Sequence, residues 1–500
     1  MQVGAVEDRQ SEKPHELALD MVTARHIPRI VIAALKGGAG KTLISIGITA
    51  AMHKRGYKVA PFKKGPDYID SAWLGIAAGA PCYNLDRYLA GTQGVRNSFA
   101  IHTIGSDLAV VEGNRGLFDG VDAVGSYSTA DLARILQAPV ALIVDATKMT
   151  RTAAALVLGC QRLERDVGLA GVILNKVAGE RHKNVLREAI EDSTGLPILG
   201  CIDKLMWSQL PQRHLGLLPI CEHPDSQKFI TQTAEIIERQ LKLDFLLSIA
   251  RNAPPLLFPP IDERPNRQVP PLENRVTIGI VRDSAFQFYY PENLEALRKQ
   301  GAELIEISAL KDKTLPDIHA LYIGGGFPEI YAETLASNEK FKTALKQAIE
   351  AGLPVYAECG GLMYLCQSIV IDHKIFPMVN IFPARAVLQR TPQGLGYITV
   401  KVVRENPFYK LGKVLTGHEF HYSTLAPENS PSREYAFEVI RGAGVGNHKD
   451  GLFYRNVLGT YLHLHALGEG AWASGIISAA RRFASRDSTV HVNDPKCAQD

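Results

Sequence analysis

The stretch AALKGGAGKTLISIGITAAM, residues 33–52, ends a β-rich run and opens a predicted helix through a glycine-rich loop. Glycines in such a loop let backbone N–H groups turn inward around phosphate oxygens, and the helix N-terminus adds a favourable dipole. We therefore predict a strand–loop–helix unit that binds the phosphates of a nucleotide. The glycines predicted to form the loop are Gly37, Gly38 and Gly40.

Side chains of this loop and of a later strand are predicted to contact ATP. Lys41 would reach the β- and γ-phosphates, and the Thr42 hydroxyl would hold Mg²⁺. The spacing is not the standard one, because Leu35 stands where a glycine is expected. The loop resembles that of the partition ATPases and dethiobiotin synthetase, in some of which the early lysine, here Lys36, reaches the nucleotide across a dimer. Asn175 could read a base edge.

Two further motifs carry acidic side chains suited to phosphate and metal chemistry. VVEGNRGLFDG (110–120) places Glu112 at the carboxyl edge of a sheet, where open α/β folds bind ligands. PFKKGPDYID (61–70) gathers Lys63 and Asp67 on one tight turn, which suits phosphate and Mg²⁺ together. The predicted magnesium ligands are Thr42, Asp67 and Glu112, and the candidate phosphate or substrate contacts are Lys63, Asp67, Asp70 and Arg115.

The chain alternates short apolar runs with amphipathic stretches, which predicts α/β domains. We expect two of them, each a mostly parallel sheet with helices on both faces, and the phosphate loop makes the first P-loop NTPase-like. Seven prolines mark the segment between the two apolar series as a linker. The predicted divisions are a loose extension (1–28), a nucleotide-binding domain (29–250), the linker (251–274), a second α/β domain (275–485) and a tail (486–500).

The predicted strands are short and rich in β-branched residues. In the first unit they are RIVIAAL (29–35), DLAVVEG (107–113), APVALIVDA (138–146) and LAGVILNKV (169–177). In the second unit they are RVTIGIV (275–281), ALYIGGG (320–326), LPVYAEC (353–359) and the start of NVLGTYLHLHAL (456–467).

Composition excludes several classes of protein. The 500 residues carry a net charge of only +3 and no long basic block, so nucleic acid is not an expected partner. Seven scattered cysteines without a C-x-x-C pair argue against a disulfide framework and for a reducing compartment. No apolar run of about 18 residues is present, so no membrane span is expected. We predict a cytoplasmic enzyme.

A second motif, VYAECGGLMYL (355–365), places Cys359 at a predicted strand-to-helix turn, as in a nucleophile elbow. Small neighbours let the strand and helix close in and leave the thiol strained and exposed. The helix N-terminus that follows is expected to lower the thiol pKa. Backbone N–H groups of Gly360 and of the loop containing Gly325 and Gly326 could form an oxyanion hole.

A cysteine nucleophile needs a base, and GTYLHLHAL (459–467) offers His463 and His465. Of two histidines at i and i+2 on a strand, one would face the site and the other would face away. The residues alone do not choose between them. Another histidine-containing segment, Gly417 to His421, has no strong metal-ligand spacing and is interpreted as a pocket wall.

The order of these motifs resembles the cobyrinic acid a,c-diamide synthases, which fuse a dethiobiotin-synthetase-like ATPase to a class I glutamine amidotransferase domain. The resemblance covers roughly residues 29–470 and implies that Cys359 is the glutaminase nucleophile and His463 its activator. It also implies a dyad, because histidine occupies position 465, where many related glutaminases carry an acid. Its motifs are KGGAGKT, PFKKGPDYID, NLDRYLAG (84–91), VVEGNRGLFDG, FQFYYPENLEAL (286–297), YIGGGFPEIYAETLASN (322–338), YAECGGLMYL and GTYLHLHAL.

The resemblance implies ATP- and glutamine-dependent amidation of the a and c acetate carboxylates of a tetrapyrrole. Mg²⁺ would be the cofactor, ATP and L-glutamine the co-substrates, and a homodimer is possible. Two departures lie at the ATP and substrate site, KGGAGKT itself and Asn114-Arg115, so nickel-sirohydrochlorin and sirohaem remain alternative substrates. A different class is a partition-type ATPase with a non-catalytic second domain. A cysteine hydrolase unrelated to ATP would not explain residues 33–120.

Overall fold

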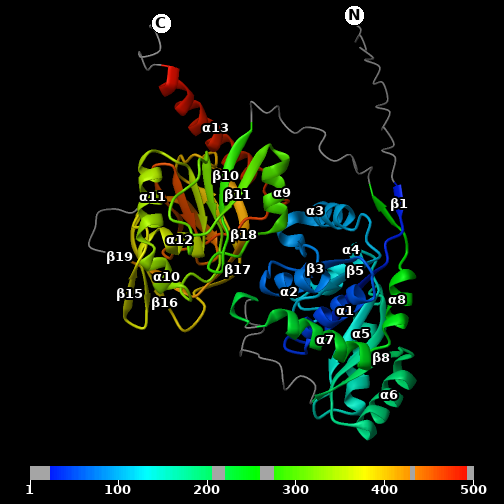
Figure 1. The fold of residues 1–500 in the computed structure, drawn as a ribbon. Helices are drawn as coiled ribbons and strands as arrows, with labels where there is room; N and C mark the ends of the chain where they lie inside the picture. The colour runs from blue at the N-terminus through cyan, green and yellow to red at the C-terminus, as the bar shows by residue number, and fades with distance from the viewer. Residues whose placement is uncertain (1–22, 205–219, 224, 259–274, 428–433, 493–500) are drawn as a thin grey trace, which may run out of the picture.

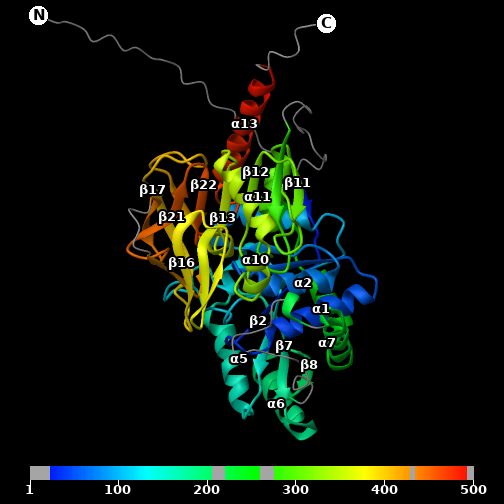
Figure 2. The same ribbon diagram turned by 60° about the vertical axis from the view of Figure 1, so that its left-hand side comes forward.

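The computed structural model describes residues 23–204, 220–223, 225–258, 275–427 and 434–492. These residues form two α/β units that lie against each other, and helix α13 projects from the second unit away from the first (Figures 1 and 2). Most of the predicted extension, residues 1–22, and most of the predicted linker, residues 259–274, lie outside the described residues. No helix within the described ranges is long and apolar enough to cross a membrane.

The first unit is built on a seven-stranded sheet in the order β4-β3-β5-β2-β6-β7-β8, in which every pairing is parallel. Parallel strands place their carboxyl ends at one edge, so the segments that follow β2, β3 and β5 meet there. The strands are β2 (Arg29–Ala34), β3 (Val59–Lys64), β4 (Tyr83–Leu85), β5 (Leu108–Glu112), β6 (Val140–Asp145), β7 (Leu169–Val177) and β8 (Ile198–Asp203).

Both faces of this sheet are covered by helices. Ile30 and Ile32 of β2 pack into one core with α1, α2, α7 and α8, whereas Val31 and Ala33 pack into the other with α3 to α6. The middle residues of the central strands are therefore apolar on both faces, as expected for a doubly covered parallel sheet. The helices are α1 (Lys41–Lys54), α2 (Ile69–Ala78), α3 (Arg87–His102), α4 (Thr129–Ile135), α5 (Arg151–Leu163), α6 (Glu180–Thr194), α7 (Ser226–Gln240) and α8 (Leu243–Arg251).

The second unit has a nine-stranded sheet in the order β11-β10-β12-β13-β22-β21-β20-β17-β18. The first five strands in this order are parallel, and the remaining four extend the sheet in antiparallel fashion. The strands are β10 (Val276–Val281), β11 (Ala302–Ile307), β12 (Ala320–Ile323), β13 (Val355–Glu358), β17 (Gly394–Val402), β18 (Val414–His421), β20 (Tyr435–Arg441), β21 (Lys449–Tyr454) and β22 (Val457–Thr460).

Helices cover both faces of the second sheet too. One face packs against α9 and α13, and the other packs against α10 to α12 and a four-stranded sheet of order β15-β14-β16-β19. These elements are α9 (Pro291–Lys299), α10 (Ala332–Ser337), α11 (Glu339–Glu350), α12 (Gly360–Leu365), α13 (Gly470–Val492), β14 (Cys366–Ile371), β15 (Lys374–Pro377), β16 (Phe382–Leu388) and β19 (Ser423–Pro427).

The α/β class predicted from the sequence is confirmed, and each predicted strand corresponds to an observed one. The predicted tail differs in extent, because α13 continues past residue 485 to Val492, and residues 493–500 lie outside the described ranges. The antiparallel strands of the second unit were not predicted, because their alternating polar and apolar side chains are weaker signals than continuous apolar runs.

The end of the predicted extension and the start of the predicted linker pair with each other. Strand β1 (Thr23–Arg25) pairs with β9 (Leu256–Phe258) in a two-stranded antiparallel sheet. Beside it, the fully buried guanidinium of Arg29 donates hydrogen bonds to four backbone carbonyls from three separate segments. Burial lowers the pKa of Arg29 to about 10. The accepting carbonyls belong to Ile27, Leu136, Gln137 and Pro254, at 2.6–3.1 Å.

We predict that Arg29→Ala destabilises the first unit by about 3 kcal/mol or more, because it leaves several buried carbonyls without donors. The measurement is the first transition in chemical denaturation. Arg25→Ala is the matched control: within the described ranges its guanidinium makes one hydrogen bond, to the Ala100 carbonyl, and its loss should cost about 1 kcal/mol or less. Equal effects of the two variants would contradict the role given to Arg29.

Candidate functional site

The phosphate-binding loop predicted from the sequence connects β2 to α1 at the carboxyl edge of the first sheet. Gly40 has φ of 93°, a conformation that favours glycine, and a Cβ there would collide with Asn175. The Asn175 amide donates to the Ala39 carbonyl at 2.8 Å, so this side chain holds the backbone of the loop in place. Lys36 is exposed at the rim of the loop, together with Gly37 and Gly38.

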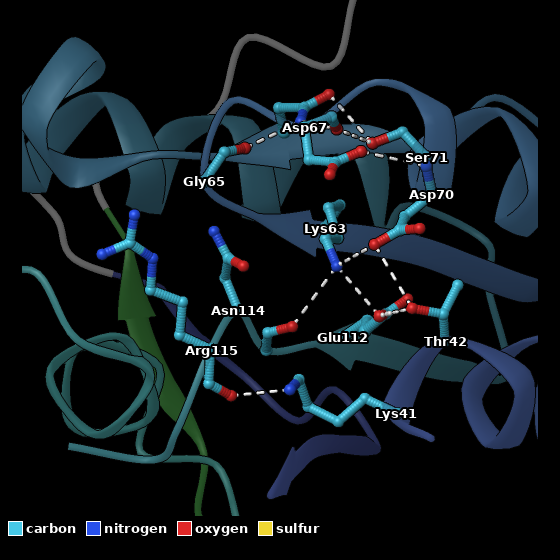
Figure 3. A network of polar contacts seen from close by, with 12 residues as sticks. Lys41, Thr42, Lys63, Gly65, Asp67, Asp70, Ser71, Glu112, Asn114 and Arg115 are labelled. Atoms are coloured by element: carbon cyan, nitrogen blue, oxygen red, sulfur yellow. Dashed lines mark hydrogen bonds and ion pairs between the residues drawn. The ribbon is translucent and has the colours of Figure 1, made fainter. Parts of the chain in front are cut away.

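Four side chains beside the loop form a buried polar network (Figure 3). The Lys63 amine lies between two carboxylates, 2.7 Å from Asp70 Oδ2 and 2.9 Å from Glu112 Oε1. The Thr42 hydroxyl donates to the same Glu112 oxygen at 2.8 Å and lies 3.3 Å from Asp70 Oδ2. Residues from β3, β5, α1 and α2 thus converge on one point.

The other predicted residues surround this network. The Lys41 amine donates to the Arg115 carbonyl at 2.6 Å (Figure 3). Asp67 is turned toward the start of α2, where its carboxylate accepts a hydrogen bond from the Asp70 amide at 3.0 Å. The carboxylate that shares contacts with Thr42 and Glu112 is therefore that of Asp70, on the first turn of α2.

Burial sets the charge of this network. Desolvation raises the pKa of Glu112 to about 7 and that of Asp67 to about 6. Desolvation alone would lower the pKa of Lys63, but the Asp70 and Glu112 carboxylates outweigh it and hold this pKa above its usual value. Glu112 also has a buried oxygen, Oε2, without a hydrogen-bond partner in the part of the chain that the structure describes.

Oxygen ligands of this kind fit a divalent cation such as Mg²⁺. The Thr42 hydroxyl and the Glu112 and Asp70 carboxylates supply hard donors in one place, and the unpartnered Glu112 oxygen is a buried acceptor for added positive charge. Within the described ranges no cluster of three or more His, Cys, Asp or Glu side chains forms a complete metal site on its own. A cation here would therefore need further ligands, such as nucleotide phosphates and water.

A cavity of about 610 Å³ opens beside this network, between the two units. The first unit lines it with the segments that follow β3 and β5, and the second with β17, β18 and the end of β20. Its basic side chains are Lys64, Arg115 and Arg441, its acidic ones Asp67, Asp119 and Glu419, and its aromatic ones Tyr68, Tyr127, Tyr397, His418 and Phe420.

The contribution of the second unit to this cavity was not predicted. Tyr397 donates a hydrogen bond from its hydroxyl to Asp86 at 2.8 Å and stacks on Tyr88 with ring centroids 3.9 Å apart. Arg441 donates to the Tyr88 hydroxyl at 3.0 Å. Nothing in the local sequence around 397 or 441 signals a site, because these residues come to the first unit only through the antiparallel extension of the second sheet.

Cys359 lies on the predicted turn, between β13 and α12. Its backbone has φ 47° and ψ −99°, an unfavourable conformation for a residue with a Cβ. Gly360 fits the close approach of the Gly326 loop, because a Cβ at 360 would lie 3.0 Å from the Gly326 amide nitrogen. The strained elbow predicted from the sequence is therefore present.

The expected exposure and lowered pKa of the thiol are wrong for the free enzyme. Cys359 is only 7% exposed, and desolvation raises its pKa far above the usual range. The nearby charges that act on it belong to the carboxylates of Glu329, Glu358 and Asp450, which also favour the neutral thiol. The dipole of a helix only six residues long does not offset these effects.

The two candidate bases face different acids. His463 is fully buried, and its Nδ1 lies 3.2 Å from Oε2 of Glu358, the residue before the cysteine. Its Nε2 has no hydrogen-bond partner among the described residues, and a Cβ on Gly325 would lie 2.7 Å from its ring. His465 instead lies with Nε2 3.6 Å from Oε1 of Glu292 on α9. Glu358 stands in the quoted motif, but its role was not predicted.

A small cavity of about 30 Å³ lies beside the thiol. This space holds a few water molecules, and the 7% exposure of Cys359 shows that the free enzyme keeps the nucleophile largely covered. Tyr68 and Phe420 line both this cavity and the large one, so they form the wall between the two. Tyr68 is stacked on Phe288 of the second unit, with ring centroids 3.6 Å apart.

Known families match both units. The CobQ/CobB/MinD/ParA nucleotide binding domain matches residues 30–215, and the CobB/CobQ-like glutamine amidotransferase domain matches residues 277–471. The cobyrinate a,c-diamide synthase of Magnetococcus marinus is 41% identical over 448 residues, 89% of this chain and 96% of that protein. Those of Archaeoglobus fulgidus and Dehalococcoides mccartyi are 40% and 42% identical, each over 92% of this chain and over 97% and 99% of their own lengths.

We predict that Lys63→Met destabilises the protein by about 3–5 kcal/mol at pH 8, because two buried carboxylates lose their counter-charge. The folded state holds the Glu112 proton up to a pH of about 7. At pH 5.5 that carboxyl is neutral, and the cost of the substitution should be smaller. Chemical denaturation at the two pH values measures both.

Lys64→Met is the matched control, because this neighbouring lysine lines the large cavity and forms none of the ion pairs seen among the described residues. Its replacement should change stability by about 1 kcal/mol or less at either pH. If Lys63→Met lowers the free energy of unfolding equally at both pH values, the carboxylates that contact Lys63 do not titrate in this range.

Proposed function

The chain belongs to the cobyrinate a,c-diamide synthase family, and on that premise we propose that it amidates the a and c acetate carboxylates of cobyrinate with ammonia from glutamine at the expense of ATP. It is thus a glutamine-dependent amidoligase of cobalamin biosynthesis. One observation supports the coupling of ATP chemistry in the first unit to ammonia release in the second. The thiol cavity and the large cavity share the wall made by Tyr68 and Phe420.

The first half of the reaction activates the substrate carboxylate. A carboxylate oxygen is a poor leaving group, and transfer of the γ-phosphoryl group of ATP makes an acyl phosphate that ammonia can attack. Lys41 and the backbone amides of the loop are suited to hold the phosphates against the carboxylate. Mg²⁺, when bound by Thr42, Glu112 and the neighbouring Asp70 or Asp67, would neutralise charge on the transferring group.

The second half releases ammonia. The Cys359 sulfur attacks the side-chain carboxamide of glutamine while His463 takes the thiol proton at Nε2. The sulfur–carbon bond forms, the carbon–nitrogen bond breaks, and the proton leaves with ammonia. Water then hydrolyses the thioester to glutamate. Because burial keeps the resting thiol neutral, we infer that its proton moves during the attack rather than before it. Backbone N–H groups of Gly360 and the Gly325–Gly326 loop are candidates for the oxyanion hole.

The large cavity is suited to a macrocycle with several carboxylates. Its volume of about 610 Å³ lies within the usual range of ligand sites. Lys64, Arg115 and Arg441 can pair with carboxylates, and the rings of Tyr127 and Tyr397 offer flat surfaces to a conjugated ligand. Since the curated relatives carry the cobyrinate name, nickel-sirohydrochlorin and sirohaem are less favoured substrates.

Three further points belong to the proposal. A non-catalytic second domain is not favoured, because the matched family of that unit is a glutamine amidotransferase domain. A homodimer in which Lys36 contacts the nucleotide of a second copy is compatible with the exposure of this side chain. ATP and glutamine are cytoplasmic metabolites, and we place the enzyme in the cytoplasm.

We predict that Cys359→Ala lowers glutamine-dependent amidation by at least about 1000-fold, because no other group replaces the nucleophile. Amidation supported by ammonium chloride at high pH should persist, because the ATP half is untouched. Product mass spectra from both assays measure the effect. Cys366→Ala, a buried cysteine on β14, is the control and should retain glutamine use. Loss of both activities in Cys359→Ala would contradict the division of labour.

We predict that Arg441→Ala raises the KM for cobyrinate about tenfold, the usual loss for one charge-assisted hydrogen bond. The increase should be the same with glutamine and with ammonium chloride, because the residue comes from the amidotransferase unit but acts on the macrocycle. Arg455→Ala removes an exposed arginine paired with Glu350 and serves as the control. An effect confined to the glutamine assay would show that Arg441 does not contact the macrocycle.

A further inference from the structure

Glu358 is a buried carboxylate that has a specific histidine partner. It is 2% exposed, ends β13 and immediately precedes the nucleophile. Its Oε2 lies 3.2 Å from His463 Nδ1 and accepts a hydrogen bond from the Tyr322 hydroxyl at 3.0 Å. No lysine or arginine pairs with it among the described residues. Burying a carboxyl group without a cation is costly, so its contact with His463 calls for an explanation.

The position of Glu358 in the chain also bears on its role. A histidine stands at position 465, where an acid would follow the base by two residues, and it faces Glu292 instead of His463. Glu358, at the end of the strand that precedes the nucleophile, instead contacts Nδ1 of His463. A third group thus contacts the base even though the sequence two residues beyond His463 offers none.

We propose that Glu358 is a positioning residue that accepts the Nδ1–H of His463, so that the lone pair of Nε2 is available for the proton of the Cys359 thiol. The proposal rests on the roles given above to the cysteine and the histidine. It makes the glutaminase centre a triad in which the acid and the nucleophile are adjacent in sequence. The carboxylate would also stabilise the imidazolium that forms when the thiol is deprotonated.

Proton placement decides whether His463 can act. With Glu358 ionised, the ring proton sits on Nδ1 and the unpartnered Nε2 can accept. With Glu358 protonated, the carboxyl donates to Nδ1, and the ring proton moves to Nε2, where it blocks the reaction. Burial raises the pKa of Glu358 to about 8 and lowers that of His463 to about 3. The active arrangement therefore increases as pH rises through about 8.

Other titratable groups surround the pair, and a pH profile must be interpreted with them in view. Tyr322 comes from β12, Cys359 follows Glu358, and the remaining groups approach from neighbouring strands and loops. They are His418, Glu419 and His421 of β18, Asp450 of β21, Glu329 of the loop after β12, and the tyrosines Tyr289, Tyr290, Tyr356 and Tyr409. None of them forms an ion pair with Glu358 among the described residues.

The test is Glu358→Gln in the full-length enzyme, with glutamine hydrolysis measured from pH 6 to pH 10. The amide oxygen can still accept from Nδ1, but it carries no charge and does not titrate. We expect kcat to fall on the order of 10- to 100-fold, as when the partner that orients a histidine is weakened, with a much smaller change in the KM for glutamine. The rise in kcat/KM centred near pH 8 should disappear.

Two matched variants separate positioning from structure. Glu292→Gln alters the other buried acid that faces a histidine, His465, and should leave the rise near pH 8 in place. Tyr322→Phe removes the hydroxyl that stabilises the Glu358 carboxylate and should move that rise to higher pH while the acid is retained. This second variant keeps the proposal testable if Glu358→Gln does not fold.

The outcomes discriminate between the proposals. Wild-type kcat and pH profile in Glu358→Gln, or an unmoved profile in Tyr322→Phe, would overturn the role of Glu358. A parallel loss of ammonium-dependent amidation would show a structural defect of the whole protein and also overturn it. If Cys359→Ala still hydrolyses glutamine, the proposed function itself fails, independently of the result at position 358.

Discussion

The stacked rings of Tyr68 and Phe288 join the two units where their chemistry meets. Tyr68 belongs to the segment between β3 and α2, which also carries the acids near the phosphate loop, and Phe288 packs against His463 with ring centroids 4.3 Å apart. A single aromatic contact therefore connects the nucleotide side of the molecule to the glutaminase base. If the units were to shift relative to each other, both cavities would change shape, because the same side chain lines them.

Each unit also buries carboxyl groups at its reaction centre, but the groups that stabilise these carboxylates differ. In the first unit the single positive charge of Lys63 lies between the carboxylates of Asp70 and Glu112, so an added cation can be accommodated. In the second unit Glu358 faces a neutral tyrosine and a histidine. The first arrangement suits the binding of charged phosphates, whereas the second suits the movement of a single proton.

Sequence patterns were sufficient for the fold class, for the phosphate loop and for the elbow at Cys359, because each depends on neighbours along the chain. They did not reveal Tyr397 or Arg441, which reach the cavity only through an antiparallel extension of the sheet. They gave a wrong pKa shift for the thiol, because local sequence does not report how deeply an elbow is buried. They also could not show that Glu358 at the end of β13 faces His463, three residues beyond the end of β22, since side-chain direction at strand ends depends on register.

The thiol cavity, in which Cys359 is only 7% exposed, has a consequence for the cell. An amidotransferase whose nucleophile is covered at rest hydrolyses glutamine slowly, and its buried sulfur is shielded from peroxide and electrophiles. Nitrogen is then released only after the surrounding aromatic side chains have moved aside. An idle enzyme would thus spare the glutamine pool of a cell that has no corrinoid to amidate.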